Sequence, residues 1–107
     1  TPNVDGFYSA TVPQPISSLT FDPDNKVVCL ETDEDTMIYV ANYTQNEEHI
    51  DISLSDKDLN ELKEEYPDKI GGATFQNLLF YPVQDMVTVN YFGIPGYYQH
   101  KHNIHFP

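Results

Sequence analysis

The sequence predicts a mainly β protein, an antiparallel meander that closes into a small barrel or sandwich, with one short α-helix at about residues 56–66. Three observations support this fold class. Short stretches of alternating apolar and polar residues recur along the chain, with turn-forming residues between them at a spacing of about ten residues. At about residues 56–66 the spacing of the apolar residues changes from the period of a strand to that of a helix. The chain has 107 residues, the size of one domain, and a flat sheet of so many strands would leave open edges.

The first half of the chain is predicted to form a series of hairpins. Turns rich in Asp, Asn, Pro and Glu separate the expected strands, which lie at residues 7–12, 17–21, 26–32, 37–44 and 49–54. Asp22-Pro23-Asp24-Asn25 is typical of a hairpin turn, because Pro presets φ and Asn tolerates the left-handed conformation. Residues 49–54 show the clearest period-two pattern, with aliphatic residues on one side and polar residues on the other.

The predicted helix begins after Ser55, a residue type that caps helix N-termini, and acidic residues follow in the first turn. Leu59, Leu62 and Tyr66 then recur at the spacing i, i+3, i+7, which gives one narrow apolar stripe on an otherwise charged helix. Pro67 disfavours helical geometry at the residue before it and ends the helix. We therefore expect the helix to lie on a sheet with this stripe facing inward.

The remainder of the chain returns to strand-like sequence. Residues 74–81 and 86–92 are rich in Phe, Leu, Val and Tyr, and residues 82–85 link them as a hairpin turn. Residues 93–107 combine Gly and Pro with aromatic residues and His, which indicates either a packed irregular tail or a final edge strand. Because no linker or repeat divides the chain, residues 1–107 are predicted to form one domain.

Acidic residues dominate the charge of the chain. Asp and Glu number 17 against 5 Lys and Arg, and the formal net charge is −12 at pH 7. Nucleic-acid binders neutralise phosphates with Lys and Arg, so this composition argues against a nucleic-acid partner and against adsorption to an anionic membrane. No apolar run approaches the ~20 residues of a transmembrane helix. The acidic residues either form a solvated surface or a negative patch that meets a basic protein.

The sequence contains no motif of a known catalytic class. Gly-x-Ser-x-Gly, His-Glu-x-x-His and Gly-rich phosphate loops are all absent from it. Pairs of carboxylates and His are frequent in so acidic a chain and indicate no active site on their own. We therefore expect a protein without enzymatic activity, catalytic residues or a cofactor.

Two groups of side chains are candidates for contact with a partner or ligand: acidic residues on the predicted helix and tyrosines near the C-terminal end. The candidates are Glu61, Glu64, Glu65, Tyr91, Tyr97 and Tyr98. Tyrosines on a loop that contains Gly and Pro offer large contact surfaces for a protein or a glycan. The alternative is that these tyrosines seal the barrel and hold the C-terminal segment in place.

His100 and His102 are candidates for metal binding. In an extended segment their side chains point to the same side, so both imidazoles can reach one Zn²⁺, Ni²⁺ or Cu²⁺ ion. His105 has the opposite parity, and further ligands would have to come from His49 or a carboxylate. Because a structural zinc site takes four ligands, the sequence favours weak, adventitious binding or an exposed polar tail without metal.

Several short motifs follow one another in an order shared with a known family. They are Gly6-Phe7-Tyr8, Leu19-Thr20-Phe21-Asp22, Lys26-Val27, Tyr43 with Ile50-Asp51-Ile52, and Met86-Val87-Thr88-Val89. On these motifs residues 6–91 resemble the small bacterial lipocalin-like (calycin-type) β-barrels of envelope proteins. The chain departs from that family at Gly6-Phe7-Tyr8, where the family has Gly-x-Trp, and in its helix, which interrupts the strands instead of following them. The resemblance implies a barrel, and side chains can fill a barrel of this size.

Together these observations favour a non-enzymatic, exported or envelope-associated β-barrel domain, such as a secreted protein or a lipoprotein, that binds a protein partner or a small ligand. The alternative is an intracellular acidic inhibitor, either a toxin-immunity protein or a nucleic-acid mimic. A signal peptide or lipobox ahead of Thr1 would support the first function, and a neighbouring toxin gene would support the second.

Overall fold

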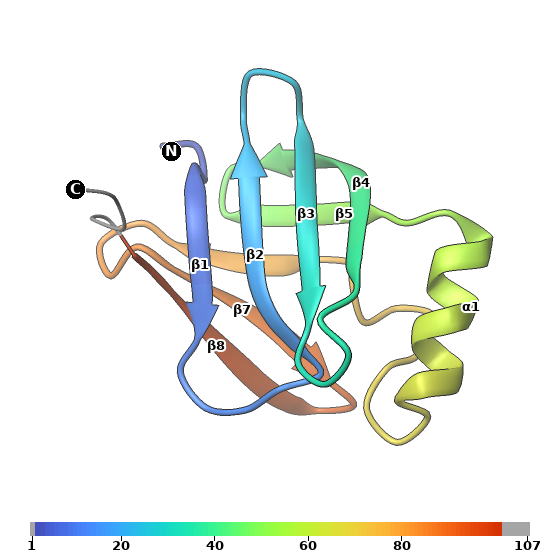
Figure 1. Ribbon diagram of the computed structural model, residues 1–107. Helices are drawn as coiled ribbons and strands as arrows, with labels where there is room; N and C mark the ends of the chain where they lie inside the picture. The colour runs from blue at the N-terminus through green and yellow to red at the C-terminus, as the bar shows by residue number, and fades with distance from the viewer. Residues whose placement is uncertain (1, 102–107) are drawn as a thin grey trace.

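A computed structural model describes residues 2–101 of the chain (Figure 1). Within these residues eight strands follow one another, and a helix lies between the fifth and the sixth. The elements are β1 (Gly6–Ala10), β2 (Ile16–Asp22), β3 (Val27–Thr32), β4 (Ile38–Asn46), β5 (His49–Ser53), α1 (Asp56–Glu65), β6 (Leu78–Tyr81), β7 (Met86–Tyr91) and β8 (Ile94–His100).

The strands form a closed antiparallel barrel. Each strand pairs with the next one in sequence, and β8 returns to pair with β1, where Tyr8 is aligned with His100 and Ala10 with Tyr98. Closure in this way gives the first and the last strand a partner on both sides. The predicted meander is confirmed, and of its two predicted forms the chain adopts the barrel.

The C-terminal part of the barrel differs from the sequence prediction. Residues 94–100, expected in a tail or an edge strand, form β8, which pairs with β7 on one side and β1 on the other. The physical reason is the closure of the sheet, because it supplies a strand partner from the far end of the chain. Residues 102–107 lie outside the described residues.

The strand predicted over residues 74–81 begins later, at Leu78. The residues before it form turns, in which the Thr74 hydroxyl accepts a hydrogen bond of 2.8 Å from the Gly71 N–H. Asn77 has a φ of 58°, and its N–H donates to the Asp51 carboxylate. Side chains that bind nearby backbone groups compete with strand pairing, which explains the shorter strand. The other strands overlap their predicted ranges.

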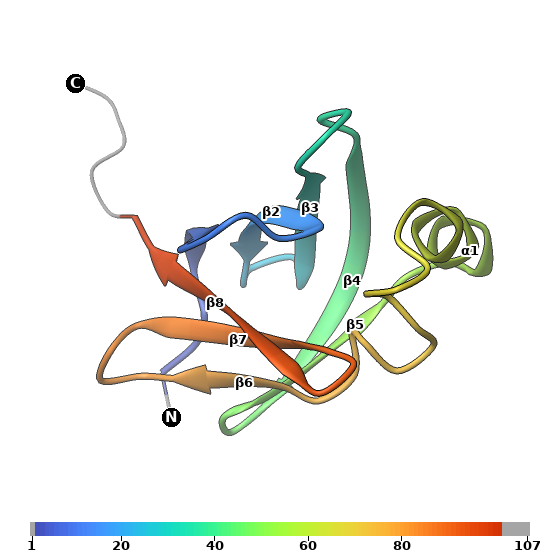
Figure 2. The same cartoon turned by 90° about the horizontal axis from the view of Figure 1, so that it is seen from below.

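The structure confirms the predicted helix. The Ser55 hydroxyl caps α1 by accepting a hydrogen bond from the Asp58 N–H, and Tyr66 ends it. Leu62 is buried, and Leu59 and Tyr66 pack against the core beside it. α1 lies outside the barrel, alongside β4 (Figures 1 and 2). Within residues 2–101 no helix has the length and apolar character needed to cross a membrane.

Aromatic and aliphatic side chains fill the interior of the barrel. Tyr8 contacts Phe21 and Phe80 edge to face, and Phe21 contacts Tyr43 in the same way at 5.1 Å between ring centroids. Aliphatic side chains with no exposed surface pack around these rings: Ile16, Leu19, Val28, Leu30, Ile50, Val87 and Val89. Because the chain's own side chains occupy the interior, the outer surface is the place to look for a binding site.

Candidate functional site

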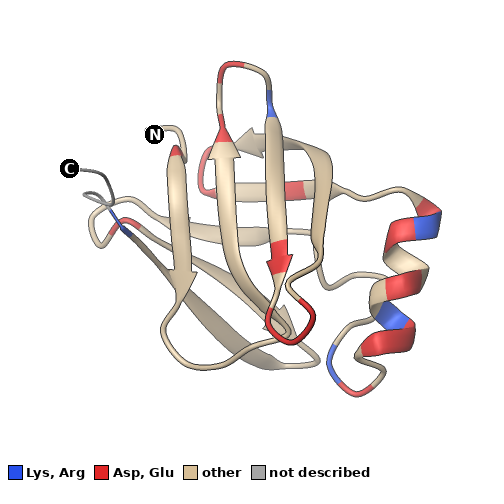
Figure 3. Cartoon of the chain, in the orientation of Figure 1, with Lys and Arg blue, Asp and Glu red and all other residues tan. Residues whose placement is uncertain are grey.

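A groove of about 400 Å³ separates β4 from α1 on the outside of the barrel. It is lined by two apolar or aromatic residues and four acidic residues: Met37, Tyr39, Asp35, Glu61, Glu64 and Glu65. We call it the acidic groove. Figure 3 shows the acidic residues of the β3–β4 loop and of α1 on the two sides of this space. Carboxylates from two separate elements therefore meet in one place.

The helix presents its carboxylates to the groove because of their spacing. Glu61, Glu64 and Glu65 lie at i, i+3 and i+4, which places them on one face of α1. Leu62 directs the neighbouring face into the core and thereby sets the rotation of the helix about its axis. Glu64 and Glu65 are exposed and Glu61 is half-buried, so the charges of Glu64 and Glu65 are the ones most accessible to a partner.

The β3–β4 loop positions the opposite wall. The Thr32 N–H donates to the Met37 carbonyl at 2.9 Å, and the Met37 N–H donates to the Thr32 hydroxyl at 2.9 Å. These bonds close the loop at its base, and Asp35 lies exposed at its tip. Met37 itself is 49% exposed, so the groove combines negative charge with accessible apolar surface.

One hydrogen-bonded chain of side chains crosses the groove. The Tyr39 hydroxyl donates to Glu61 at 3.1 Å, and Lys57 contacts the other oxygen of Glu61 at 3.0 Å. Burial, followed by the bond to Glu61, raises the pKa of the Tyr39 hydroxyl to about 12. The bonds from Lys57 and from Tyr39 lower the pKa of Glu61. Glu61 is therefore held in its ionised form.

The six candidate contact residues do not lie together. Glu61, Glu64 and Glu65 share the acidic groove. Tyr91 and Tyr98, in contrast, are buried with exposed fractions of 1% and 0%. Their hydroxyls bond to each other, and the Tyr98 hydroxyl also donates to the Ile16 carbonyl at 2.7 Å. These two tyrosines belong to the core, so an exposed contact surface cannot include them. Tyr97 is exposed on β8 but does not line the groove.

His100 lies in the seam that closes the barrel. Its Nδ1 atom is 2.6 Å from Asp85, and its ring stacks on Tyr8 at 4.7 Å between centroids. The Tyr8 hydroxyl donates to the second oxygen of Asp85 at 2.7 Å. His102, the other candidate metal ligand, lies outside the described residues. From residue 2 to residue 101, no three His, Cys, Asp or Glu side chains are grouped so that they could hold a metal ion.

The sequence prediction missed the β4 side of the groove, formed by Asp35, Met37 and Tyr39. One signal was present in the sequence. Residues 37–41 are apolar or aromatic at every position, whereas a strand with one solvated face alternates. The outer-face residues of this run are Ile38 and Val40, so the pattern indicates an unusually apolar outer face on β4 but does not identify Tyr39 as a groove residue.

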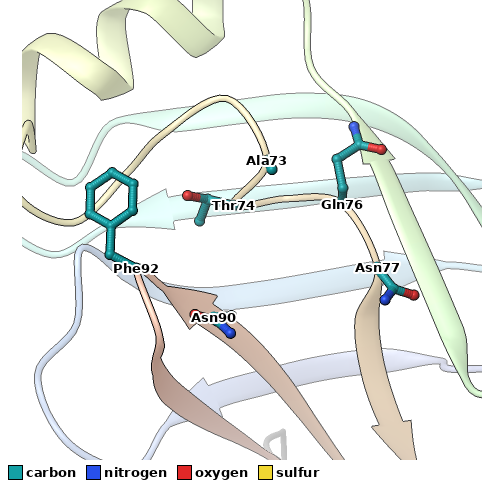
Figure 4. Close-up of a pocket in the computed structure, with 6 residues that line it drawn as sticks. All are labelled: Ala73, Thr74, Gln76, Asn77, Asn90 and Phe92. Carbon is teal, nitrogen blue, oxygen red and sulfur yellow. The ribbon is translucent and has the colours of Figure 1, made fainter.

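A second hollow, of about 300 Å³, lies between the turn before β6 and the end of β7 (Figure 4). Its lining is neutral and consists of Ala73, Thr74, Gln76, Asn77, Asn90 and Phe92. Phe92 is 60% exposed, and its ring lies against Gly71, where a Cβ atom would come within 2.6 Å of it. The side chains of this hollow carry no charge that could select a ligand.

Comparison of the chain with protein-family models, with curated proteins and with solved structures finds no match. The closed eight-stranded antiparallel barrel is consistent with the lipocalin-like barrels that the sequence resembles, whereas α1 lies between β5 and β6 instead of after the strands. That agreement concerns the fold alone.

Proposed function

We propose that this chain is a non-enzymatic binding domain that holds a basic segment of a partner protein in the acidic groove. The observation that carries the proposal is the meeting of Asp35 from one element with Glu61, Glu64 and Glu65 from another, around the accessible side chain of Met37. Carboxylates held close together repel one another, so a cationic side chain placed among them relieves that repulsion. The apolar surface of Met37 adds contact area for the stem of a Lys or Arg side chain.

The charge of the whole chain favours the same kind of partner. A net charge of −12 at pH 7 attracts basic proteins over distances of about 8–10 Å at moderate salt and accelerates their association. The filled interior of the barrel leaves the outer surface for binding, which favours a protein partner over a small ligand enclosed by the strands.

The proposal includes an exported or envelope-associated location, for which the resemblance to lipocalin-like envelope barrels is the support. An intracellular acidic inhibitor is the second candidate. The acidic groove favours it as well, because basic toxins and nucleases carry the Lys and Arg that such a groove would bind. Fractionation of the source cells with immunodetection separates the two: chain in the envelope or medium supports the first, and chain in the cytoplasm supports the second.

The test of the groove is binding of a short synthetic peptide in which Lys and Val alternate, measured by calorimetry at low and at physiological salt. We expect the double variant Glu64→Lys/Glu65→Lys to weaken binding about tenfold or more. Asp24→Lys/Glu48→Lys is the matched control, because it changes the net charge equally at exposed positions in the β2–β3 and β4–β5 turns. Equal effects of the two double variants, or equal binding of a peptide with Glu in place of Lys, would refute the proposal.

A further inference from the structure

The two strands next to the acidic groove differ in length. β4 begins at Ile38, but β5 ends at Ser53, which pairs with Asn42. Residues 38–41 of β4 therefore extend past the end of β5, on the side where α1 lies (Figure 2). Tyr39, in the middle of this stretch, lines the groove. The groove thus lies where the next strand of the sheet would continue.

The register of β4 shows which of its backbone groups face the groove. The Thr32 N–H donates to the Met37 carbonyl, and the Tyr43 N–H donates to the Lys26 carbonyl, so odd-numbered residues face β3. Successive residues of a strand direct their N–H and C=O groups to opposite sides. Ile38 and Val40 therefore direct theirs away from β3, and within residues 2–101 no strand pairs with them on that side.

The side chains of the same stretch are also accessible. Ile38 is 62% exposed and Val40 is 59% exposed on the outer face of the barrel, whereas the Tyr39 side chain leaves the opposite face of the strand and bonds to Glu61 of α1. A strand added along this edge would place alternate side chains beside Ile38 and Val40. The side chains between them would face the carboxylates of the groove.

We propose that β4 accepts an extended segment of the partner protein as an additional strand along Ile38–Val40, with basic side chains of that segment reaching into the acidic groove. This inference rests on the proposed function and specifies how the partner is held. The N–H and C=O groups of Ile38 and Val40 bind the main chain of the segment, as in other cases of strand addition. The carboxylates select a sequence in which Lys or Arg alternates with apolar residues.

Charge decides between this occupant and a second copy of the chain. Pairing of β4 with β4 of another molecule would bring together two acidic grooves on molecules that each carry a net charge of −12. Like charges at such close range oppose association. A basic segment meets the same edge with the opposite charge, so it is the occupant that the groove favours.

The experiment is amide hydrogen exchange, followed by NMR, with and without the alternating Lys–Val peptide. We expect the Ile38 and Val40 amides to exchange at least about tenfold more slowly when the peptide is bound. The Tyr39 and Ala41 amides face β3 in the free protein and serve as internal controls. Two further peptides carry N-methyl groups on alternate residues, one set for each edge of the extended peptide. One of them is expected to lose binding and the other to retain it, and neither changes the folded protein.

The possible results distinguish the inference from the proposed function. If the peptide binds and Glu64→Lys/Glu65→Lys weakens it, but both N-methylated peptides bind equally, strand addition is refuted and the acidic groove stands as a binding site. If the basic peptide shows no salt-sensitive binding, both are refuted. Protection of the Ile38 and Val40 amides that grows with protein concentration alone would overturn the basic segment as occupant in favour of a second copy of the chain.

Discussion

The Tyr39 hydroxyl donates a hydrogen bond of 3.1 Å to the Glu61 carboxylate, and this bond joins β4 to α1 across the acidic groove. The two residues come from opposite walls, so their contact helps to set the distance between the strand edge and the helix. Glu64, Glu65 and Asp35 remain exposed around this hydrogen-bonded pair. A groove whose walls are tied together loses less conformational entropy when a partner binds.

The first prediction concerns the pKa of Glu61. Tyr39→Phe removes one of its two hydrogen-bond donors, so we expect the pKa to rise toward the ordinary value of 4.5. Lys57→Met should raise it further, because the bond from Lys57 is the larger cause. Side-chain carboxyl chemical shifts followed by NMR over acidic pH measure both changes. A carboxyl group whose pKa is lowered on folding contributes stability at pH values above its pKa in the unfolded chain. The contribution of Glu61 is therefore lost as pH falls below 4.5. An unchanged Glu61 titration in Tyr39→Phe would show that the hydrogen bond is not formed in solution.

The second prediction concerns alkaline pH. Burial raises the pKa of Tyr39 from 10.0 to about 12 and raises the pKa values of Tyr91 and Tyr98 as well. A group whose pKa is raised on folding contributes stability below its unfolded pKa and loses it as pH rises toward the folded one. We therefore expect the free energy of unfolding in urea to fall between pH 10 and about 12. Tyr39→Phe should show a shallower fall over this interval, and an identical fall in the variant would contradict the assignment.

The third prediction concerns the packing of the helix. Leu62 is 1% exposed, so Leu62→Ala should lower the free energy of unfolding by about 2–4 kcal/mol through lost burial and the cavity that remains. Leu59 is half-buried on the same stripe, and Leu59→Ala should cost clearly less. Chemical denaturation of both variants tests this order. A loss below about 0.5 kcal/mol for Leu62→Ala, typical of exposed sites, would show that α1 is not packed on the barrel.

The features that the sequence predicted well are those determined by neighbouring residues. The Ser55 cap, the Leu59, Leu62 and Tyr66 stripe and the stop at Pro67 all act within a few residues, and the observed helix has these bounds. The hairpin strands follow from alternation and turn residues in the same way. The acidic groove depends instead on Tyr39 and Glu61, which are 22 positions apart. Their contact depends on the curvature of the sheet and on the rotation of α1 about its axis, and no local sequence pattern determines either of these.

The tyrosines show what a stricter use of strand geometry could have predicted. Neighbouring residues in a strand face opposite sides, so Tyr97 and Tyr98 could not both be exposed once residues 94–100 formed a strand. The structure places Tyr98 inside and Tyr97 outside. The sequence prediction did not decide whether this segment is a tail or an edge strand. The strand that pairs with its free edge is β1, which lies at the other end of the chain.

The last prediction compares two buried tyrosine hydroxyls. The Tyr98 hydroxyl donates to the Ile16 carbonyl at 2.7 Å and also bonds to Tyr91, whereas the Tyr43 hydroxyl is buried without a hydrogen-bond partner in the described part of the chain. Substitution by Phe removes the same oxygen atom at each position and keeps the ring.

Tyr98→Phe should lower the free energy of unfolding by about 1–3 kcal/mol, because it leaves the buried Ile16 carbonyl short of a donor. Tyr43→Phe should be neutral or stabilising, because it removes a buried polar group that gains nothing from the fold and keeps the edge-to-face contact with Phe21. Urea denaturation of the two variants and the unsubstituted protein at neutral pH gives the comparison. Equal losses in both variants would show that Tyr43 has a bonding partner, such as an enclosed water molecule, and that the barrel interior is less apolar than its side chains indicate.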